Sequence, residues 1–379
     1  MANKYWIGGG ANTNWATSAN WSLSSGGAAG GGIPTSADVA NFTGVGTNAN
    51  GVSTISATIT VGGLIILPGF TGSIVHNAVL TCSATLTLGA NYTISGTSSM
   101  TINLATSMTS NGKTWPNNMT MTGASTIKTL VDNWTIDGTL TVSSTTVLNG
   151  NNLYVAGMTM TSPISGTTHI HFSGTGTWSG TQAIGNNVTF EGATTVSGVV
   201  GYTAGTMTYS SGTVTTTGST LTLTTTPTLN TPGVHWNNVQ VANSTTVTLN
   251  AKLLIDDTLS TAATQNVVFA GTHAWSADTL LHNGVGACTL TLKENLQYEV
   301  WGALSIAQCR VAAPVHVLSS STTVKADIYL HPNARCECMA QFTDINASPG
   351  RPINTFNGLI TDCINIYRYT DLKTVATTF

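Results

Sequence analysis

Two long stretches of this sequence contain no charged side chain. No Asp, Glu, Lys or Arg occurs in residues 39–112 or 138–190, and charged residues make up 7% of the whole chain, against roughly 25% in an ordinary soluble domain. Hydroxyl and amide side chains supply the polarity instead. A fold that stacks equivalent positions about 4.8 Å apart would place like charges directly over one another, where they repel. The absence of charge therefore favours a stacked β-structure.

The polar and apolar residues alternate in short runs. Val, Ile, Leu and Thr alternate with a period of two, and 41% of the residues are hydrophobic, which argues against disorder. Short runs such as 57–61, 85–88, 139–142 and 245–249 are separated by Gly and Asn. β-Branched residues favour extended backbone, whereas Gly and Asn favour turns. Regular short strands of this kind predict an all-β sandwich, barrel or solenoid.

One pattern occurs twice, about 120 residues apart. Residues 115–119 (WPNNM) lead to 136–140 (IDGTL), and residues 236–239 (WNNV) lead to 255–259 (IDDTL). A third, partial copy is found at 186–190 (NNVTF). Stacked coils require such recurrence, because each coil covers the apolar face of its neighbour. We therefore predict a parallel β-helix (β-solenoid), with coils of about 20 to 25 residues, in preference to a pair of β-sandwiches.

Charge divides the chain into parts. The segment from residue 285 onward holds 14 of the 25 charged residues, evenly split in sign, while the first 44 residues are rich in Trp and Gly. We expect an N-terminal attachment or capping segment at 1–44, the β-solenoid at 45–284 and a smaller C-terminal β module at 285–379. The open strand edges at both ends of a solenoid need caps or burial between chains, and a trimer is one solution.

Charge and hydropathy also exclude partners. The formal net charge is −3 and no basic stripe is present, which argues against nucleic acid as a partner. No apolar run reaches the roughly 18 residues of a membrane helix, and none at the N-terminus has secretory length. We expect no membrane partner and a protein that stays in a cytoplasm until assembly.

The N-terminal segment carries an ordered set of motifs. It resembles the W-x-G-G…W…NWS…G-x-P-T-x-x-D…F entry segment of tailed-bacteriophage virion proteins, which also occurs at the repeat starts of bacterial autotransporter-like adhesins. A later run at 342–358 looks like a C-terminal segment of phage structural proteins. The entry motif covers about a tenth of the chain, and its matching residues are 6–9 (WIGG), 14–15 (NW), 20–22 (NWS), 34–38 (PTSAD) and Phe42.

This resemblance implies a β-helical, trimeric protein on the virion surface, assembled in the host cytoplasm. Two roles fit: a capsid decoration (cement) protein that contacts the major capsid protein or another virion protein, or a tail spike or fibre that binds host surface glycan. Autotransporters would need a signal peptide and a translocating barrel, and the sequence departs from them on both counts. We therefore favour a phage virion protein over an autotransporter. The family supplies no catalytic positions.

Tryptophans are the candidate assembly contacts. Trp6, Trp15 and Trp21 could each anchor an interface, because Trp buries much area at little entropic cost. The alternative is a local hydrophobic plug over the first coil. The later tryptophans are expected in the core or at coil corners: Trp115, Trp134, Trp236 and Trp275.

Candidate catalytic groups are scarce. Cleavage of polysaccharide usually needs two carboxylates in one groove, and the solenoid offers only Asp132, Asp137, Glu191, Asp256 and Asp257. Asp137 and Asp256 hold equivalent places in the repeat, which is more typical of a turn residue than of a catalytic one. We therefore expect a protein that is not an enzyme, with no catalytic residue and no cofactor.

Two groups of residues could bind a metal, and we predict that neither does. His169 and His171 would share one face of a strand. Cys336 and Cys338 form a Cys-x-Cys pair, with Cys309, Cys363 and His331 as conceivable partners, but the spacing matches no standard zinc module. Small buried thiols, kept reduced, are the simpler interpretation.

The leading functional hypothesis is a trimeric capsid decoration protein that braces neighbouring capsomers at threefold positions. The second is a tail spike or fibre that recognises host glycan, and the third is a polysaccharide depolymerase. No phosphate-binding loop, nucleophile elbow or zincin helix is present in the sequence.

Overall fold

The computed structural model of the protein describes residues 1–103, 106–123, 126–242, 245–261, 266–282, 288–306, 315–338, 340–348, 350–355, 360–361 and 366–368. The chain is 58% strand and 1% helix and forms a parallel β-solenoid of about 13 turns, which confirms the predicted fold class. It divides into two units, Met1–Thr194 and Thr195–Phe379. Within the described residues no helix is long and apolar enough to cross a membrane.

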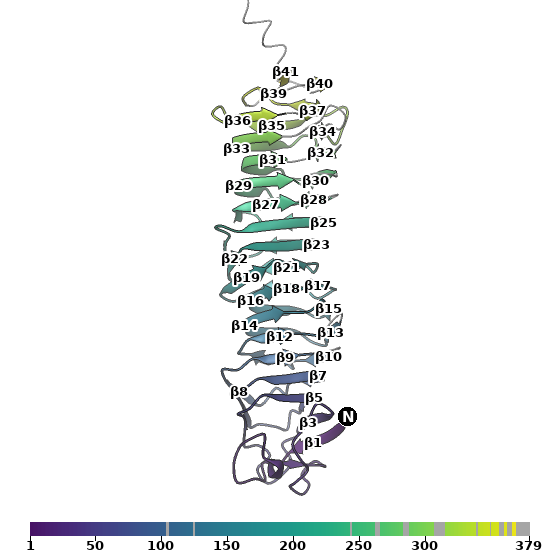
Figure 1. The fold of residues 1–379 in the computed structure, drawn as a ribbon, viewed down its shortest axis with the longest axis vertical. Coiled ribbons are helices and arrows are strands. Elements are labelled where there is room, and N and C mark those ends of the chain that lie inside the picture. Colours follow the sequence, from purple (N-terminus) through teal and green to yellow (C-terminus); the bar gives the residue numbers. More distant parts are fainter. Residues whose placement is uncertain are drawn as a thin grey trace, which may run out of the picture. The chain divides into compact units, whose positions relative to one another are not determined.

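Each coil of the first unit contributes three strands in chain order, which we call its first, second and third positions. Strands at one position lie over one another in Figure 1. First-position strands are β4 (Val52–Ile55), β6 (Ser73–His76), β8 (Thr93–Gly96), β11 (Thr114–Trp115), the starts of β14 (Trp134–Val142) and β16 (Leu153–Met160), β18 (Ile170–Phe172) and β21 (Val188–Phe190). Second-position strands are the starts of β5 (Ile59–Ile66) and β7 (Leu80–Thr87), then β9 (Met100–Ile102), β12 (Met119–Met121), the ends of β14 and β16, and β19 (Gly176–Gly180). Third-position strands are the ends of β5 and β7, β10 (Thr106–Thr109), β13 (Thr126–Leu130), β15 (Thr146–Gly150), β17 (Ile164–Ser165) and β20 (Ala183–Ile184), and β22 (Ala193–Ser197) follows β21.

The second position shows why charge is scarce along the coils of this unit. Its parallel register places one outward hydroxyl over the next through seven coils, at about 4.8 Å per step. One pair in this column, Thr159 and Ser179, is hydrogen-bonded at 3.2 Å. Inward residues on either side form apolar columns, such as Leu80 over Met100 over Met119. We call the outward column the hydroxyl ladder; its members are Thr60, Thr81, Thr101, Thr120, Thr141, Thr159 and Ser179.

The second unit repeats this three-strand coil. Figure 1 shows its strands in teal to yellow. Its strands are β23 (Val199–Tyr209), β24 (Thr213–Thr215), β25 (Thr220–Asn230), β26 (His235–Trp236), β27 (Asn238–Val241), β28 (Thr246–Leu249), β29 (Leu253–Thr261), β30 (Val267–Gly271), β31 (Trp275–His282), β32 (Cys288–Leu292), β33 (Gln297–Ile306), β34 (Val315–Ser319), β35 (Ala326–Leu330), β36 (Arg335–Cys338), β37 (Ala340–Thr343), β38 (Ile345–Asn346), β39 (Ile353–Thr355), β40 (Ile360–Thr361) and β41 (Ile366–Arg368).

Many strands run longer than the sequence predicts, because a bulge carries the chain around a corner without ending the strand. In β14 the register shifts between Ile136 and Thr139, and in β29 it shifts between Ile255 and Thr258. A bulge adds unpaired residues and bends the strand. The shorter runs expected from sequence are therefore parts of longer strands in several coils.

In the structure, the two parts of each copy of the long sequence repeat lie on neighbouring coils. Trp115 pairs with Ile136 in the first unit, and Trp236 pairs with Ile255 in the second. The third, partial copy at 186–190 is not equivalent. Its apolar Val188 pairs with Ile170 at the first strand position, whereas Met119 in the first copy lies at the second position.

The charged C-terminal region continues the coil pattern of the second unit. β31 pairs in parallel with β33, and β30 pairs in parallel with β32, so strands before and after residue 284 share one register. The boundaries at 44 and 284 stay predictions about folding units. What changes after residue 284 is the composition of the outward residues, since the apolar inward residues continue through Leu290, Val300 and Val317.

Candidate functional site

The candidate assembly tryptophans form the interior of an N-terminal cap. β1 (Ala2–Trp6) pairs antiparallel with β2 (Trp21–Ser22) and parallel with β3 (Asp38–Phe42). Trp6, Trp15 and Trp21 are at most 1% exposed. Ring centroids lie 5.3 Å apart for Trp6 and Trp21, 4.8 Å for Trp15 and Trp21, and 5.5 Å for Trp15 and Phe42. Within the chain the three indoles pack as a hydrophobic plug, and their role as assembly contacts stays a prediction.

Polar residues of the entry motif secure the turns of this cap. Asn20, in the short 3-10 helix η1 (Ser18–Asn20), is buried, and its Oδ1 accepts a hydrogen bond from the amide of Gly10 at 2.7 Å. The carboxylate of Asp38 accepts hydrogen bonds from the amide and hydroxyl of Thr35, at 2.9 and 2.8 Å. These hydrogen bonds lower the pKa of Asp38 against the opposing effect of desolvation. The motif residues thus build one capping element.

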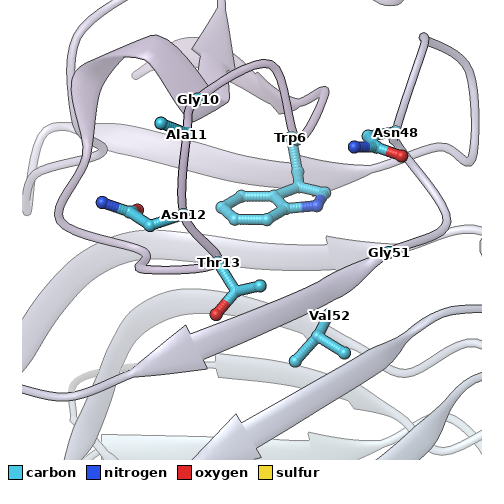
Figure 2. A pocket seen from close by; sticks show the side chains of 9 residues that line it. Trp6, Gly10, Ala11, Asn12, Thr13, Asn48, Gly51 and Val52 are labelled. Atoms are coloured by element: carbon cyan, nitrogen blue, oxygen red, sulfur yellow. The ribbon is translucent and has the colours of Figure 1, made fainter.

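A hollow of about 190 Å³ opens on the cap (Figure 2). In Figure 2 the indole of Trp6 lies between the loop that carries Asn12 and the side chain of Asn48. Gly8 has a φ of 60°, and a Cβ there would lie 2.5 Å from the carbonyl oxygen of Asn48, so the position requires glycine. The described lining residues carry amides, a hydroxyl and apolar groups. The hollow can donate and accept hydrogen bonds, but these residues offer no acid–base group.

The two candidate histidines lie together, as predicted. The rings of His169 and His171 are 4.2 Å apart, and His171 stacks on Tyr154 at 4.5 Å. Each ring has a partner on the next coil: Thr189 Oγ1 at 2.7 Å from His169 Nε2, and Glu191 Oε1 at 2.8 Å from His171 Nδ1. Burial and the neighbouring His171 lower the pKa of His169. Among the described residues no group of three or more His, Cys, Asp or Glu is arranged to hold a metal ion.

The predicted carboxylates have separate surroundings. Asp132 accepts hydrogen bonds from the amides of Ser110 and Asn111, at 2.7 and 2.6 Å, and so fixes a turn of the preceding coil. Asp137 and Asp256 each follow the last first-position residue of a bulged strand, Ile136 or Ile255. The repeat therefore assigned them correctly to equivalent corner positions.

The thiols are divided between described and undescribed residues. Cys82 and Cys288 are buried, and Cys336 is half-buried. Burial raises the pKa of the Cys82 thiol to about 12, so it is protonated at neutral pH. Cys309 and Cys363 lie outside the described residues, as does the side chain of Cys338.

A second hollow lies at one corner of the second unit. We call it the corner hollow; its volume is about 270 Å³ and its lining residues are His235, Leu254, Ile255, Asp256, Ser276, Asp278 and Trp301. They come from four consecutive coils, through β26, β29, β31 and β33. At the bulge of β29, Asp256 and Asp257 lie opposite the single residue Asp278 of β31. At the next step, Asp278 lies opposite Trp301 and Gly302 of β33.

Trp301 is the unusual member of this hollow. Eight of the nine tryptophans are less than 2% exposed, whereas Trp301 is 46% exposed. Its Nε1 donates a hydrogen bond to Ser276 Oγ at 2.9 Å. Its ring centroid lies 5.2 Å from that of His331 and 5.8 Å from that of Tyr329. The indole is thus supported by two rings of the next coil and held in one orientation.

Carboxylates complete the corner hollow. Asp256 Oδ1 lies 2.7 Å from Nδ1 of His235 on the preceding coil. The carboxylate of Asp278 packs against Gly302, where a Cβ would approach its oxygens to 2.4 Å. When ionised, carboxylates accept hydrogen bonds and do not donate them. The hollow therefore combines an aromatic surface with hydrogen-bond acceptors.

No sequence pattern indicated Asp278, Trp301 or Tyr329 as site residues. One signal could have found the corner: Asp257-Thr258-Leu259 is followed by Asp278-Thr279-Leu280 and then by Gly302-Ala303-Leu304. In the structure, Thr258 pairs with Thr279, and Thr279 pairs with Ala303 on the following coil. No sequence signal indicates that Trp301 is exposed. Its exposure depends on its place opposite the bulge at Asp278, which only the structure shows.

Comparisons with protein-family models, with curated proteins and with solved structures found no match to this chain.

Proposed function

We propose that this chain is a structural protein of the surface of a tailed-phage particle, and specifically a trimeric capsid decoration protein. The observation that best supports the proposal is the hydroxyl ladder, whose seven uncharged rungs follow one another without a break. Every coil there hydrogen-bonds to the next in parallel register, which suits a load-bearing scaffold. The entry-motif residues add a packed cap at the start of that scaffold.

Decoration would stabilise a shell by mass action. A protein that binds only the assembled lattice adds RT ln(1 + [L]/Kd) per site, about 4 kcal/mol at a thousandfold excess over Kd. Because the three cap indoles are buried, the contacts would come from other groups on the cap. The hollow beside Trp6, with its amide and hydroxyl lining, is the surface that we assign to this contact.

The copy number in purified particles tests this proposal. A decoration protein occurs in many trimers spread over the head, and removing it lowers the temperature at which the shell releases its genome. A few copies confined to the tail would overturn decoration in favour of a spike or fibre. A monomer in solution, measured by light scattering of the isolated folded chain, would contradict the trimer.

A tail spike or fibre is the second candidate, and the exposed Trp301 favours it. An accessible aromatic ring in a surface hollow, with polar groups beside it, is a common feature of ligand-binding sites. Gold-labelled antibody against the chain would mark the tail in this case and the head in the first.

A further inference from the structure

We propose that the corner hollow is a binding site for a neutral oligosaccharide, with Trp301 as its stacking platform. The inference goes beyond a structural role and does not depend on whether the chain decorates the head or the tail. It is carried by the position of one exposed indole beside carboxylates on adjacent coils.

The platform is preorganised. Trp301 is fixed on one edge by its hydrogen bond to Ser276 and supported by the rings of His331 and Tyr329. A side chain already held in its binding orientation loses little entropy when a ligand arrives. An aromatic ring with a free, rigid surface is suited to the flat C–H face of a pyranose.

The supporting rings argue against a cation cage. Such a cage surrounds a cation with aromatic faces, but here the centroids of His331 and Tyr329 lie only 5.2 and 5.8 Å from that of Trp301. Rings at that separation pack against one another and leave no space for a cation between them. Trp301 therefore offers one open surface.

The polar groups select for hydroxyl donors. Asp256 and Asp278 present acceptor oxygens beside the platform, and the hydroxyls of a sugar can donate to them. The same carboxylates repel an anionic chain of uronic or sialic acids. Charge thus favours a neutral sugar over an acidic one.

The arrangement of the site favours several sugar units. Its lining groups lie on successive coils: His235, then Asp256, then Asp278, then Trp301. Three steps of about 4.8 Å span roughly 15 Å along the stack. A site of that length is matched by a short oligosaccharide rather than by a monosaccharide.

The test uses the full chain and immobilised six-unit oligomers of glucose, mannose and galactose, with a chitosan hexamer and an oligogalacturonate of equal length. We expect binding to at least one neutral oligomer and none to oligogalacturonate. Trp301→Ala should weaken that binding at least about tenfold, Trp301→Phe should keep part of it, and Asp278→Asn should weaken it. Val131→Ala, an exposed residue of the other unit, should leave it unchanged.

Three outcomes would overturn the proposal. Failure of every neutral oligomer to bind excludes the ligand class, a preference for the chitosan hexamer assigns the hollow to cations, and equal binding by Trp301→Ala places binding elsewhere. Thermal unfolding of each variant, followed by circular dichroism, shows whether a loss of binding comes from the platform or from misfolding. Trp301→Phe, which keeps an aromatic ring beside His331 and Tyr329, should leave the unfolding temperature closer to that of the parent than Trp301→Ala does.

Discussion

Asn118 Oδ1 accepts a hydrogen bond of 2.9 Å from the backbone amide of Thr139, one coil later. The second unit contains the same contact, in which Asn238 accepts from Thr258 at 3.2 Å. Each donor amide lies directly after a bulge, where the ladder between strands is interrupted. The asparagine side chain therefore replaces a backbone partner at the corner.

Asn118→Ala should lower the free energy of unfolding by about 1 kcal/mol, because the corner amide loses its acceptor. Asn238→Ala should have an effect of similar size on the second unit. Chemical denaturation followed by circular dichroism measures both. Asn77→Ala, at an exposed asparagine after β6, is the control, and an equal loss there would show that the corner contact contributes nothing specific.

The hydroxyl ladder should reject like charges. Thr120→Glu combined with Thr141→Glu places two carboxylates on adjacent rungs, and the pair should cost about 0.5 to 1 kcal/mol more than the sum of the single changes. The double variant Thr120→Glu, Thr141→Lys should lose less stability than the sum of its two single changes. Thermal melts at low and high salt measure the coupling, which should shrink with salt. Additive behaviour in both pairs would contradict direct stacking.

The cap should behave as core. Trp15 is fully buried against Trp21 and Phe42, so Trp15→Ala should destabilise the first unit by about 3 to 5 kcal/mol. The measurement is the unfolding temperature of the isolated chain. A variant that folds with normal stability but no longer assembles would instead support Trp15 as an assembly contact.

Acid should weaken the first unit through His76. The imidazole is 1% exposed and packs edge-on against Trp115 at 4.8 Å, and burial lowers its pKa to about 4. The unfolded chain takes up this proton near pH 6.5 and the folded chain only near pH 4. The free energy of unfolding should therefore fall as the pH drops through this window, by about 1.4 kcal/mol per pH unit.

A pH series of unfolding measurements on His76→Leu isolates this contribution. The variant should lose that part of the dependence, whereas His273→Ala, at an exposed histidine, should keep it. An unchanged slope in His76→Leu would show that other groups cause the acid sensitivity.

The sequence predicts the fold well because stacking imposes a pattern on every coil. The absence of charge reflects rung-over-rung register, as in Thr120 over Thr141, and the repeat identifies coil neighbours such as Trp115 and Ile136. Local similarity alone misled at residues 186–190, where the same letters occupy another strand position. A match of a few residues does not determine which strand position of the coil those residues occupy.

The candidate site was much less predictable. Burial of Trp6, Trp15 and Trp21 against one another depends on contacts between β1, β2 and β3, and the sequence left the plug and the interface equally open. The corner hollow needs four coils to come together before Asp256, Asp278 and Trp301 become neighbours. Such a site is a property of the stacking register, which sequence spacing indicates only after the coil length is known.

The most direct test of the stacked register uses nitroxide spin labels at Thr120→Cys and Thr141→Cys. The parent chain and both single variants, treated with the same label, are the controls for the native cysteines. Adjacent rungs about 4.8 Å apart bring the two labels into contact. Direct stacking of Thr120 over Thr141 predicts strong exchange broadening in the double variant alone. A double-variant spectrum equal to the sum of the two single-variant spectra would contradict it.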